Sequence, residues 1–252
     1  MPITKGLEVA GLSDVGCQRQ ENEDYYSYWS PEQSQEFERK GQFVIVADGM
    51  GGHEGGQEAS HLAVEAIQES YSGAAGDDPA LALLAGFQEA HRRIVQYANE
   101  HPHLRGMGTT ATAAAVLGNR LYYAHIGDSR LYLVRGGKIT RVTHDHSYVS
   151  RLVESGAISP EEAEIHPQRH VLTAALGVGI EVAPDMPETP VSLNSGDILV
   201  LCTDGLWGVV SEDQIRDKVM QFPPEEACRQ LVELAKNMGG PDNITVQVAR
   251  VS

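Results

Sequence analysis

Three apolar segments follow one another closely in the middle of the chain, and their spacing constrains the fold more than any other feature. Residues 109–117 and 120–126 are separated only by Gly118 and Asn119, and residues 131–135 come soon after. A connection of two residues that contains glycine or asparagine joins antiparallel neighbours, so these segments predict consecutive β-hairpins. The chain is therefore expected to build mostly antiparallel sheet.

Strand and helix patterns are interleaved along the rest of the chain. Residues 43–47 (FVIVA) form an unbroken apolar run, which is typical of a buried strand. Further strands are predicted at residues 6–12, 197–203 and 243–251. Apolar residues recur every three or four positions in the predicted helices, which cover residues 57–70, 79–99, a segment from Ser211 onward and residues 224–237. Hairpins combined with helix pairs predict an α+β fold with helices packed outside the sheets.

Residues 147–191 have a different pattern. Two short helical pieces, 147–155 and 160–165, precede a proline-rich stretch without a long strand. Irregular long connections often carry function, so we expect a lid or recognition surface that lies on the main body. A packed structural connection is the alternative. No linker in the sequence is long enough to separate two domains, so residues 1–252 are expected to form a single domain.

Composition excludes several classes of partner. The chain has 19 Lys and Arg against 35 Asp and Glu, a formal net charge of −16. The phosphate backbone of nucleic acids and anionic membrane surfaces would repel so acidic a chain. The first twenty residues contain no signal-peptide pattern, and the apolar runs are far too short to span a membrane. The three cysteines are few and far apart, so we expect a reduced, soluble, cytoplasmic protein.

Aspartates occur repeatedly where predicted strands begin or end. Asp48, Asp128 and Asp204 each follow an apolar strand, whereas Asp242 precedes the last strand and Asp24 precedes two tyrosines. Any single Asp-Gly pair is more simply a turn. If these ends converge, however, the like charges require cations, and oxygen ligands with few nearby His or Cys favour Mg²⁺ or Mn²⁺ over zinc. Two such ions about 4 Å apart can activate a water and hold a phosphoryl group.

Two further residues are candidates for the chemistry of such a site. Arg19 lies five residues before Asp24, and its guanidinium could bind two phosphate oxygens; the alternative is a solvated surface arginine. Residues 48–56 (DGMGGHEGG) lack the Gly-Lys-Ser/Thr of a P-loop, so their glycines are expected to free backbone carbonyls for a metal. His53 in this loop could be a general acid, or simply an exposed histidine.

Six motifs now stand together in one order. They are GLSDVGCQRQENEDYY, VIVADGMGGHEGG, GMGTTATAA, AHIGDSRLYL, LCTDGLWGVV and GGPDNITV. In this combination the sequence resembles the metal-dependent PPM family of type 2C protein serine/threonine phosphatases, of the compact bacterial type. The resemblance implies a central sandwich of two antiparallel β-sheets, flanked by helix pairs, with metal ions at one end.

The resemblance also implies a role for each motif residue. It implies that Asp48 bridges two metal ions, that the Gly49 carbonyl binds one of them, and that Asp204 and Asp242 bind the other. Asp24 would act through a metal-bound water, with Glu23 nearby, and Asp128 would hold a third, weaker ion together with Asp204. Arg19 would bind the substrate phosphate, and Asn243 would support the ligands. Residues of about 143–193 would match the family's flap, which shapes substrate access.

Two departures from the family pattern are visible. Some members have a histidine directly after the Asp-Gly pair, as a proposed general acid; here that position is Met50, and the nearest histidine is His53. A metal-bound water is the alternative proton donor. The polar residues 30–40 are expected to form an enlarged hairpin loop.

The predicted activity is hydrolysis of phosphoserine and phosphothreonine on proteins, which reverses protein kinase signalling. A water or hydroxide that bridges two Mn²⁺ or Mg²⁺ ions would attack phosphorus in line. We expect a monomer whose partners are phosphorylated protein substrates, and neither nucleic acid nor a membrane. The alternatives are a phosphoprotein-binding module that has kept the fold and a hydrolase for small phosphate esters or nucleotides.

Overall fold

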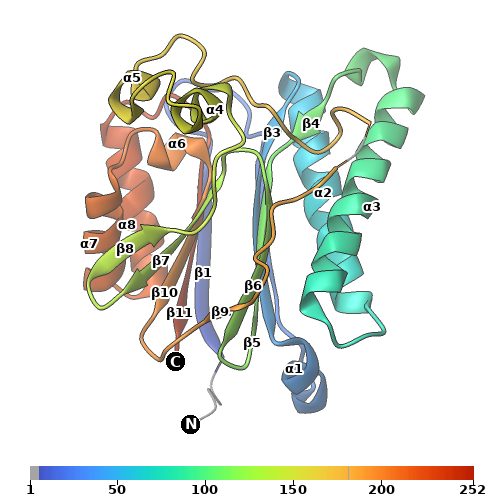
Figure 1. The fold of residues 1–252 in the computed structure, drawn as a ribbon, viewed down its shortest axis with the longest axis vertical. Helices are drawn as coiled ribbons and strands as arrows, with labels where there is room; N and C mark the ends of the chain where they lie inside the picture. Colours follow the sequence, from blue (N-terminus) through green and yellow to red (C-terminus); the bar gives the residue numbers. More distant parts are fainter. Residues whose placement is uncertain (1–5, 181) are drawn as a thin grey trace.

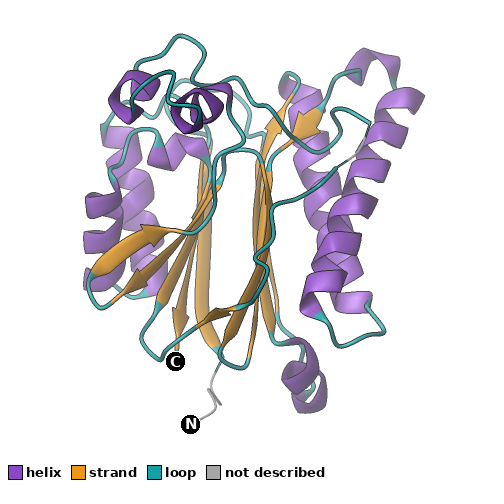
Figure 2. Ribbon diagram, viewed as in Figure 1, coloured by secondary structure: helices purple, strands orange, loops and turns teal. Residues whose placement is uncertain are grey.

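A computed structural model describes residues 6–180 and 182–252, apart from the side chain of His53. Two antiparallel sheets face each other, and a pair of helices covers the outer face of each sheet (Figures 1 and 2). The predicted α+β sandwich with outer helix pairs is thereby confirmed.

The first sheet contains both ends of the described chain. Its strand order is β1-β11-β10-β7-β8. The bounds are Leu7–Asp14 for β1, Ile244–Val251 for β11, Ile198–Cys202 for β10, Arg130–Arg135 for β7 and Lys138–Arg141 for β8. Helices α7 (Glu212–Gln221) and α8 (Pro224–Asn237) pack against this sheet, as the apolar cluster that they share with β7, β10 and β11 shows.

The second sheet has the order β2-β3-β5-β6-β9. Its strands are β2 (Asp24–Trp29), β3 (Gln42–Met50), β5 (Ala111–Leu117), β6 (Arg120–Ile126) and β9 (Val191–Ser192), and the short β4 (Gly108–Thr109) pairs with the end of β3. Helices α2 (His53–Gly73) and α3 (Pro79–Glu100) cover its outer face. The predicted hairpin of residues 109–117 and 120–126 is the β5–β6 pair.

Alternation along β3 explains why its central residues 43–47 are all apolar. Phe43, Ile45 and Ala47 lie in the cluster formed with α2 and α3. Val44 and Val46 lie instead in the cluster between the two sheets. Because both faces of the strand are buried over residues 43–47, these five positions are all apolar, and the polar residues Gln42 and Asp48 lie on either side of them.

Residues 30–40 differ from the prediction. The expected enlarged hairpin loop contains α1 (Ser34–Lys40), which ends at Gly41 with a φ of 66°. The Lys40 ammonium is buried and donates to the carbonyl oxygen of Ser72 at the end of α2. A seven-residue helix is marginal alone, so contacts of this kind stabilise it.

The segment between β8 and β9 crosses from one sheet to the other (Figure 1). It carries α4 (Tyr148–Glu154) and α5 (Pro160–Glu164) in the two predicted helical places. Beyond these helices, Leu176 is buried and pairs with Thr109 of β4, and Asp185 pairs with His125 of β6. The segment is therefore attached to the second sheet through backbone hydrogen bonds.

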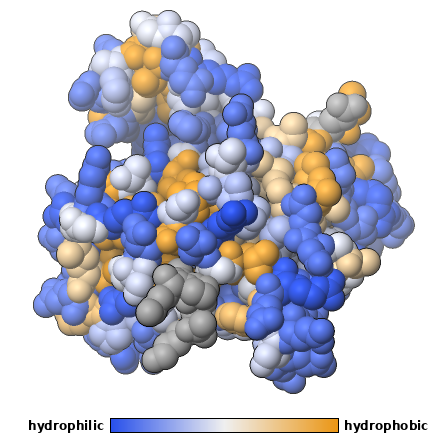
Figure 3. Space-filling model, turned by 60° about the horizontal axis from the view of Figure 1, so that its bottom comes forward, coloured by the Kyte–Doolittle hydropathy of each residue, from blue (hydrophilic) through white to orange (hydrophobic). Residues whose placement is uncertain are grey.

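The remaining described helices are short: η1 covers Pro102–Leu104 and α6 covers Asp204–Trp207. None of the helices within the described ranges is long and apolar enough to cross a membrane. Figure 3, which brings the bottom of Figure 1 forward, shows hydrophilic residues around smaller apolar patches on that face.

Candidate metal centre

The β2–β3 pairing places two of the predicted ligands opposite each other. Asp24, the first residue of β2, is the register partner of Asp48 near the end of β3. The Asp24 side chain is buried, and its Oδ2 accepts a hydrogen bond of 2.8 Å from the Thr203 hydroxyl. Thr203 directly precedes Asp204 at the end of β10, so this bond joins the ligand positions of the two sheets.

The backbone around Asp48 is held on both sides. Its N–H donates to the Thr110 hydroxyl oxygen at 3.0 Å, and its carbonyl oxygen accepts from the Thr110 N–H at 2.9 Å and the Thr109 hydroxyl at 2.8 Å. At the next residue, a Cβ on Gly49 would collide with the Gly56 carbonyl. Glycine is thus required where β3 meets the first turn of α2.

Asn243 ties the connection between β1 and β2 to the start of β11. Its Nδ2 donates to the carbonyl oxygens of Val15 at 3.0 Å and Glu21 at 2.9 Å, and its Oδ1 accepts from the Glu23 N–H at 2.8 Å. These contacts fix the neighbouring Asp242 beside the loop that carries Arg19. Arg19 Nη2 lies 2.7 Å from Asp242 Oδ2, and the Arg19 side chain is 48% exposed.

Asp128 lies between β6 and β7 and is buried. Its backbone carbonyl accepts a hydrogen bond of 2.9 Å from the Trp207 indole N–H. Trp207 ends α6, the helix that begins with Asp204. From the segment between β8 and β9, His170 Nδ1 approaches Asp204 Oδ2 to 3.8 Å.

The carboxylates influence one another electrostatically. Burial, followed by the charges of Asp204 and Asp242, raises the pKa of Asp24 to about 7, against two hydrogen bonds that lower it. The pKa of Asp48 is raised well above its ordinary value by burial first and then by the other four aspartates, Asp24, Asp204, Asp128 and Asp242. Burial and the charge of Asp204 act on Asp128 in the same direction. The cluster therefore resists full ionisation without a cation.

Two oxygens of this cluster indicate what it can bind. Asp24 Oδ1 and Asp204 Oδ1 are buried, and neither has a hydrogen-bond partner among the described residues. A buried acceptor without a partner costs free energy that a bound cation would recover. The donors are hard carboxylate oxygens, which suit Mg²⁺ and Mn²⁺. The residues present thus fit a divalent ion.

The arrangement is not a closed metal cage. Within the described residues, no three His, Cys, Asp or Glu side chains already gather closely enough to hold an ion. Asp24 is bonded to Thr203 and Asp242 to Arg19. Like charges repel one another, so a cation would have to draw these carboxylates together.

The structure brings most of the predicted site residues to one end of the sandwich, near α6 in Figure 1. They are Arg19, Asp24, Asp48, Gly49, Asp128, Asp204 and Asp242. The charged residues of this set are linked by strand pairing, by an ion pair or by the effect of one charge on the pKa of another, and Gly49 adjoins Asp48. The side chain of His53 lies outside the described residues. The glycine-rich stretch is not a free loop throughout, because α2 begins at His53 and includes Gly55 and Gly56.

Sequence reasoning missed three residues of this region. Thr203 and Trp207 flank Asp204 in the TDGLW motif, so their nearness to the ligands had a local signal. His170 had none, because it is 34 residues away from Asp204 in an irregular segment. Its proximity depends on the path of the chain.

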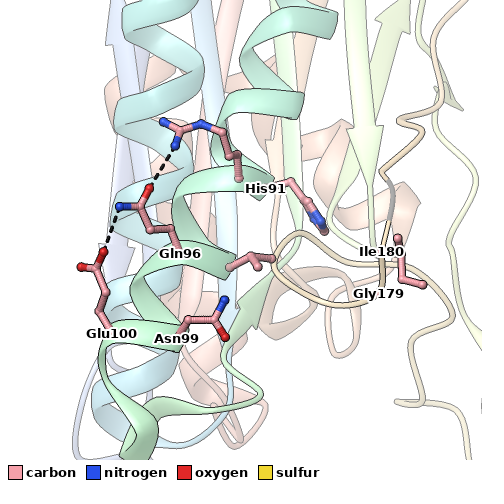
Figure 4. A pocket seen from close by; sticks show the side chains of 8 residues that line it. His91, Gln96, Asn99, Glu100, Gly179 and Ile180 are labelled. Carbon is pink, nitrogen blue, oxygen red and sulfur yellow. Dashed lines mark hydrogen bonds between the residues drawn. The ribbon is translucent and has the colours of Figure 1, made fainter.

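A separate groove of about 590 Å³ lies along α3. Figure 4 shows the His91 side chain of the helix pointing toward the loop of Gly179 and Ile180, whereas Gln96 and Glu100, which also line the groove, extend away from that loop. The Gly177 N–H donates to His91 Nδ1 at 3.2 Å, which attaches this part of the chain to α3. The residues that line the groove include none of the predicted ligands, so the groove is distinct from the carboxylate cluster.

Comparison with known proteins gives a consistent result. The family model described as protein phosphatase 2C matches residues 18–239. The chain is 38% identical to the protein phosphatase PhpP of Streptococcus pneumoniae, over 98% of each chain. The serine/threonine phosphatase PstP/Ppp of Mycobacterium tuberculosis is 39% identical, with a TM-score of 0.86 over 98% of this chain and 99% of that one. A structure of the PstP catalytic domain in complex with two manganese ions is 38% identical, with a TM-score of 0.83 over 97% of each chain.

Proposed function

The chain belongs to the protein phosphatase 2C family, and we propose that it hydrolyses phosphoserine and phosphothreonine on proteins with the help of bound metal ions. This activity reverses protein kinase signalling. The observation that carries the proposal is the cluster of five aspartates with two unpartnered buried oxygens, Asp24 Oδ1 and Asp204 Oδ1, beside the exposed guanidinium of Arg19.

We propose that the predicted ligands hold Mn²⁺ or Mg²⁺. Asp48 would contact two ions, the Gly49 carbonyl one of them, and Asp204 and Asp242 the other, while Asp24 would act from beside them. Asp128 and Asp204 would hold a weaker third ion. When bound, the ions supply an activated water and offset negative charge on the phosphoryl group.

Arg19 is proposed to bind the substrate phosphate. Its guanidinium is about half exposed. The hydrogen bond to Asp242 is the main cause of its raised pKa, and the negative charges of Asp242, Glu23 and Asp48 add to it. The group therefore remains charged, and its planar N–H donors match two phosphate oxygens.

His53 remains our proposed proton donor to the leaving hydroxyl. It begins α2, directly after the turn that leaves β3 beyond Asp48 and Gly49. Imidazole titrates near neutral pH and is suited to this transfer.

Residues 143–193 are proposed to form a flap that shapes substrate access within a single domain of residues 1–252. The close approach of His170 to Asp204 supports this role, because it brings the segment to a proposed ligand.

We further propose that the protein acts as a cytoplasmic monomer on phosphorylated proteins. The net charge of −16 supports substrates other than nucleic acids and anionic membranes.

The test is phosphate release from a phosphothreonine peptide with and without Mn²⁺, for the wild type and Asp204→Ala. We expect metal-dependent release that the variant loses. Asp77→Ala is the matched control, because Asp77 is exposed and pairs with Arg39 at another site. No release from folded wild type at any Mn²⁺ or Mg²⁺ concentration would favour a phosphoprotein-binding module. Faster release from nucleotides than from phosphopeptides would favour a small-ester hydrolase.

A further inference from the structure

Arg130 is the first residue of β7, two positions after Asp128, and its side chain is only 14% exposed. Nε lies 3.0 Å from Asp145 Oδ1, and Nη2 lies 2.6 Å from Asp145 Oδ2. The Asp145 side chain is 7% exposed. Burying such a pair costs desolvation free energy that its attraction barely recovers, so net stability alone does not explain it.

The Arg130 guanidinium also lies on an aromatic ring. Its Cζ is 3.5 Å from the centroid of the Trp207 ring, a favourable cation–π geometry. The edge of the same ring donates from Nε1 to the Asp128 carbonyl oxygen at 2.9 Å. Asp145, Arg130, Trp207 and Asp128 thus form one continuous chain of contacts.

These contacts join three parts of the molecule. Asp128 lies in the β6–β7 connection, Trp207 ends the helix that begins with Asp204, and Asp145 lies just beyond β8, where the crossing segment begins. The Asp145 carboxylate also accepts from Arg141 at 3.2 Å, which fixes it to the end of β8. A change in any of these contacts would alter the position of Asp128 relative to Asp204.

We infer that Arg130 and Trp207 are positioning residues that hold Asp128 and Asp204 at the spacing needed for the weaker third ion. The inference rests on the proposed function and deepens it. Asp145 links this pair to the base of residues 143–193. Residues that orient ligands typically change metal affinity by about 10- to 100-fold when they are replaced, so the effect is measurable without turnover.

The experiment uses Arg130→Lys and Trp207→Phe. Lysine keeps the positive charge but cannot form the two-pronged bond or lie flat on the ring, and phenylalanine keeps an aromatic ring but lacks the N–H. Arg135→Lys is the matched control, because Arg135 ends the same strand and makes the corresponding bonds to buried Asp197, at 3.0 Å and 2.5 Å. Calorimetric titration with Mn²⁺ alone counts the ions and measures their affinities.

We expect both variants to bind the two tighter ions like the wild type, with a dissociation constant for the weakest ion raised by roughly tenfold. The Mn²⁺ concentration needed for phosphate release should rise in parallel, whereas the KM for phosphopeptide at saturating Mn²⁺ should not change. Arg135→Lys should match the wild type in all three quantities. If Arg130→Lys does not fold, Trp207→Phe provides the same test through the loss of a single donor.

Three results would overturn the inference: unchanged affinities in both variants, an equal loss in Arg135→Lys, or wild type that binds only two ions. A wild type that binds three ions but releases no phosphate would instead contradict the proposed function. The two failures are therefore distinguishable, because the titration requires no catalysis.

Discussion

Arg19 Nη2 lies 2.7 Å from Asp242 Oδ2, so the arginine proposed to bind phosphate is paired with a carboxylate proposed to bind metal. The two side chains are 48% and 33% exposed, and a pair so open to solvent contributes little to stability. The proposed ligand of Arg19 is a phosphate, which carries more negative charge than the Asp242 carboxylate. The proposed ligand of Asp242 is a divalent metal ion, which carries more positive charge than the Arg19 guanidinium. The contact is therefore one that the loaded site would exchange.

Replacement of Arg19 by Ala should raise the KM for a phosphopeptide by roughly tenfold and change kcat little, because it removes binding that is present before and during reaction. Mn²⁺ affinity should not weaken, since Asp242 loses a competing cation. Steady-state kinetics and Mn²⁺ titration measure both effects. Arg39→Ala, which breaks the exposed pair with Asp77, is the control. A loss confined to kcat would contradict the assigned role.

Replacement of Asp48 by Asn should lower turnover by orders of magnitude. It should also raise the melting temperature in EDTA, because an amide replaces a buried carboxyl whose raised pKa makes it costly either to ionise or to keep protonated at neutral pH. The increase in melting temperature on addition of Mn²⁺ should shrink, since ligand binding to the native state is its cause. Thermal unfolding with either additive tests this, with Asp77→Asn as the exposed control. Near-normal turnover at saturating Mn²⁺ would exclude Asp48 as a ligand.

Much of the architecture could be predicted from local patterns. Residues 43–47 are apolar on both faces because β3 lies between a helical layer and another sheet. The strand β2 was missed, since it has half-exposed tyrosines where an unbroken apolar run would have been recognised. The helix α1 was missed because it is short and depends on Lys40 reaching the end of α2.

Some features of the candidate site could likewise be predicted from local patterns, and others could not. Asp48, Asp128, Asp204 and Asp242 were predictable because each stands beside a predicted strand. The pairing of Asp24 with Asp48 was not, because it depends on β2, which was missed. The bonds from Thr203 to Asp24 and from Trp207 to Asp128 span 179 and 79 residues. The first bond joins the two sheets, and the second joins α6 to the connection between β6 and β7, and no local periodicity encodes either contact.

Replacement of Asp128 by Ala should reduce turnover and leave two ions tightly bound. The variant removes a carboxylate but keeps the backbone carbonyl that accepts from Trp207, so α6 should remain in place. Metal analysis after dialysis, together with kcat at rising Mn²⁺, separates the two effects. Asp213→Ala on the exposed face of α7 is a suitable control. Fewer than two retained ions would show that Asp128 belongs to the tighter sites.

His125 of β6 provides a pH-dependent contribution to stability that is separate from the carboxylates. It is fully buried, with Nδ1 2.8 Å from the Thr112 hydroxyl and Nε2 donating to the His144 carbonyl oxygen at 2.9 Å. Burial, and next the neighbouring His146, lowers its pKa to about 4. An unfolded chain returns this histidine to an ordinary pKa of about 6.5.

Between these two pKa values the unfolded state binds a proton that the native state excludes, so stability should fall as the pH falls from about 6.5 towards 4. From roughly pH 7.5 to pH 5 the loss due to His125 should be about 2 kcal/mol. Urea unfolding in EDTA measures this loss as the difference in the pH dependence of stability between wild type and His125→Gln. The variant is less stable at every pH because its buried hydrogen bonds change, so only the pH dependence is compared. His103→Gln, at a side chain 61% exposed, should keep the wild-type pH dependence. An equal slope in wild type and His125→Gln would mean that the buried imidazole takes up its proton without unfolding.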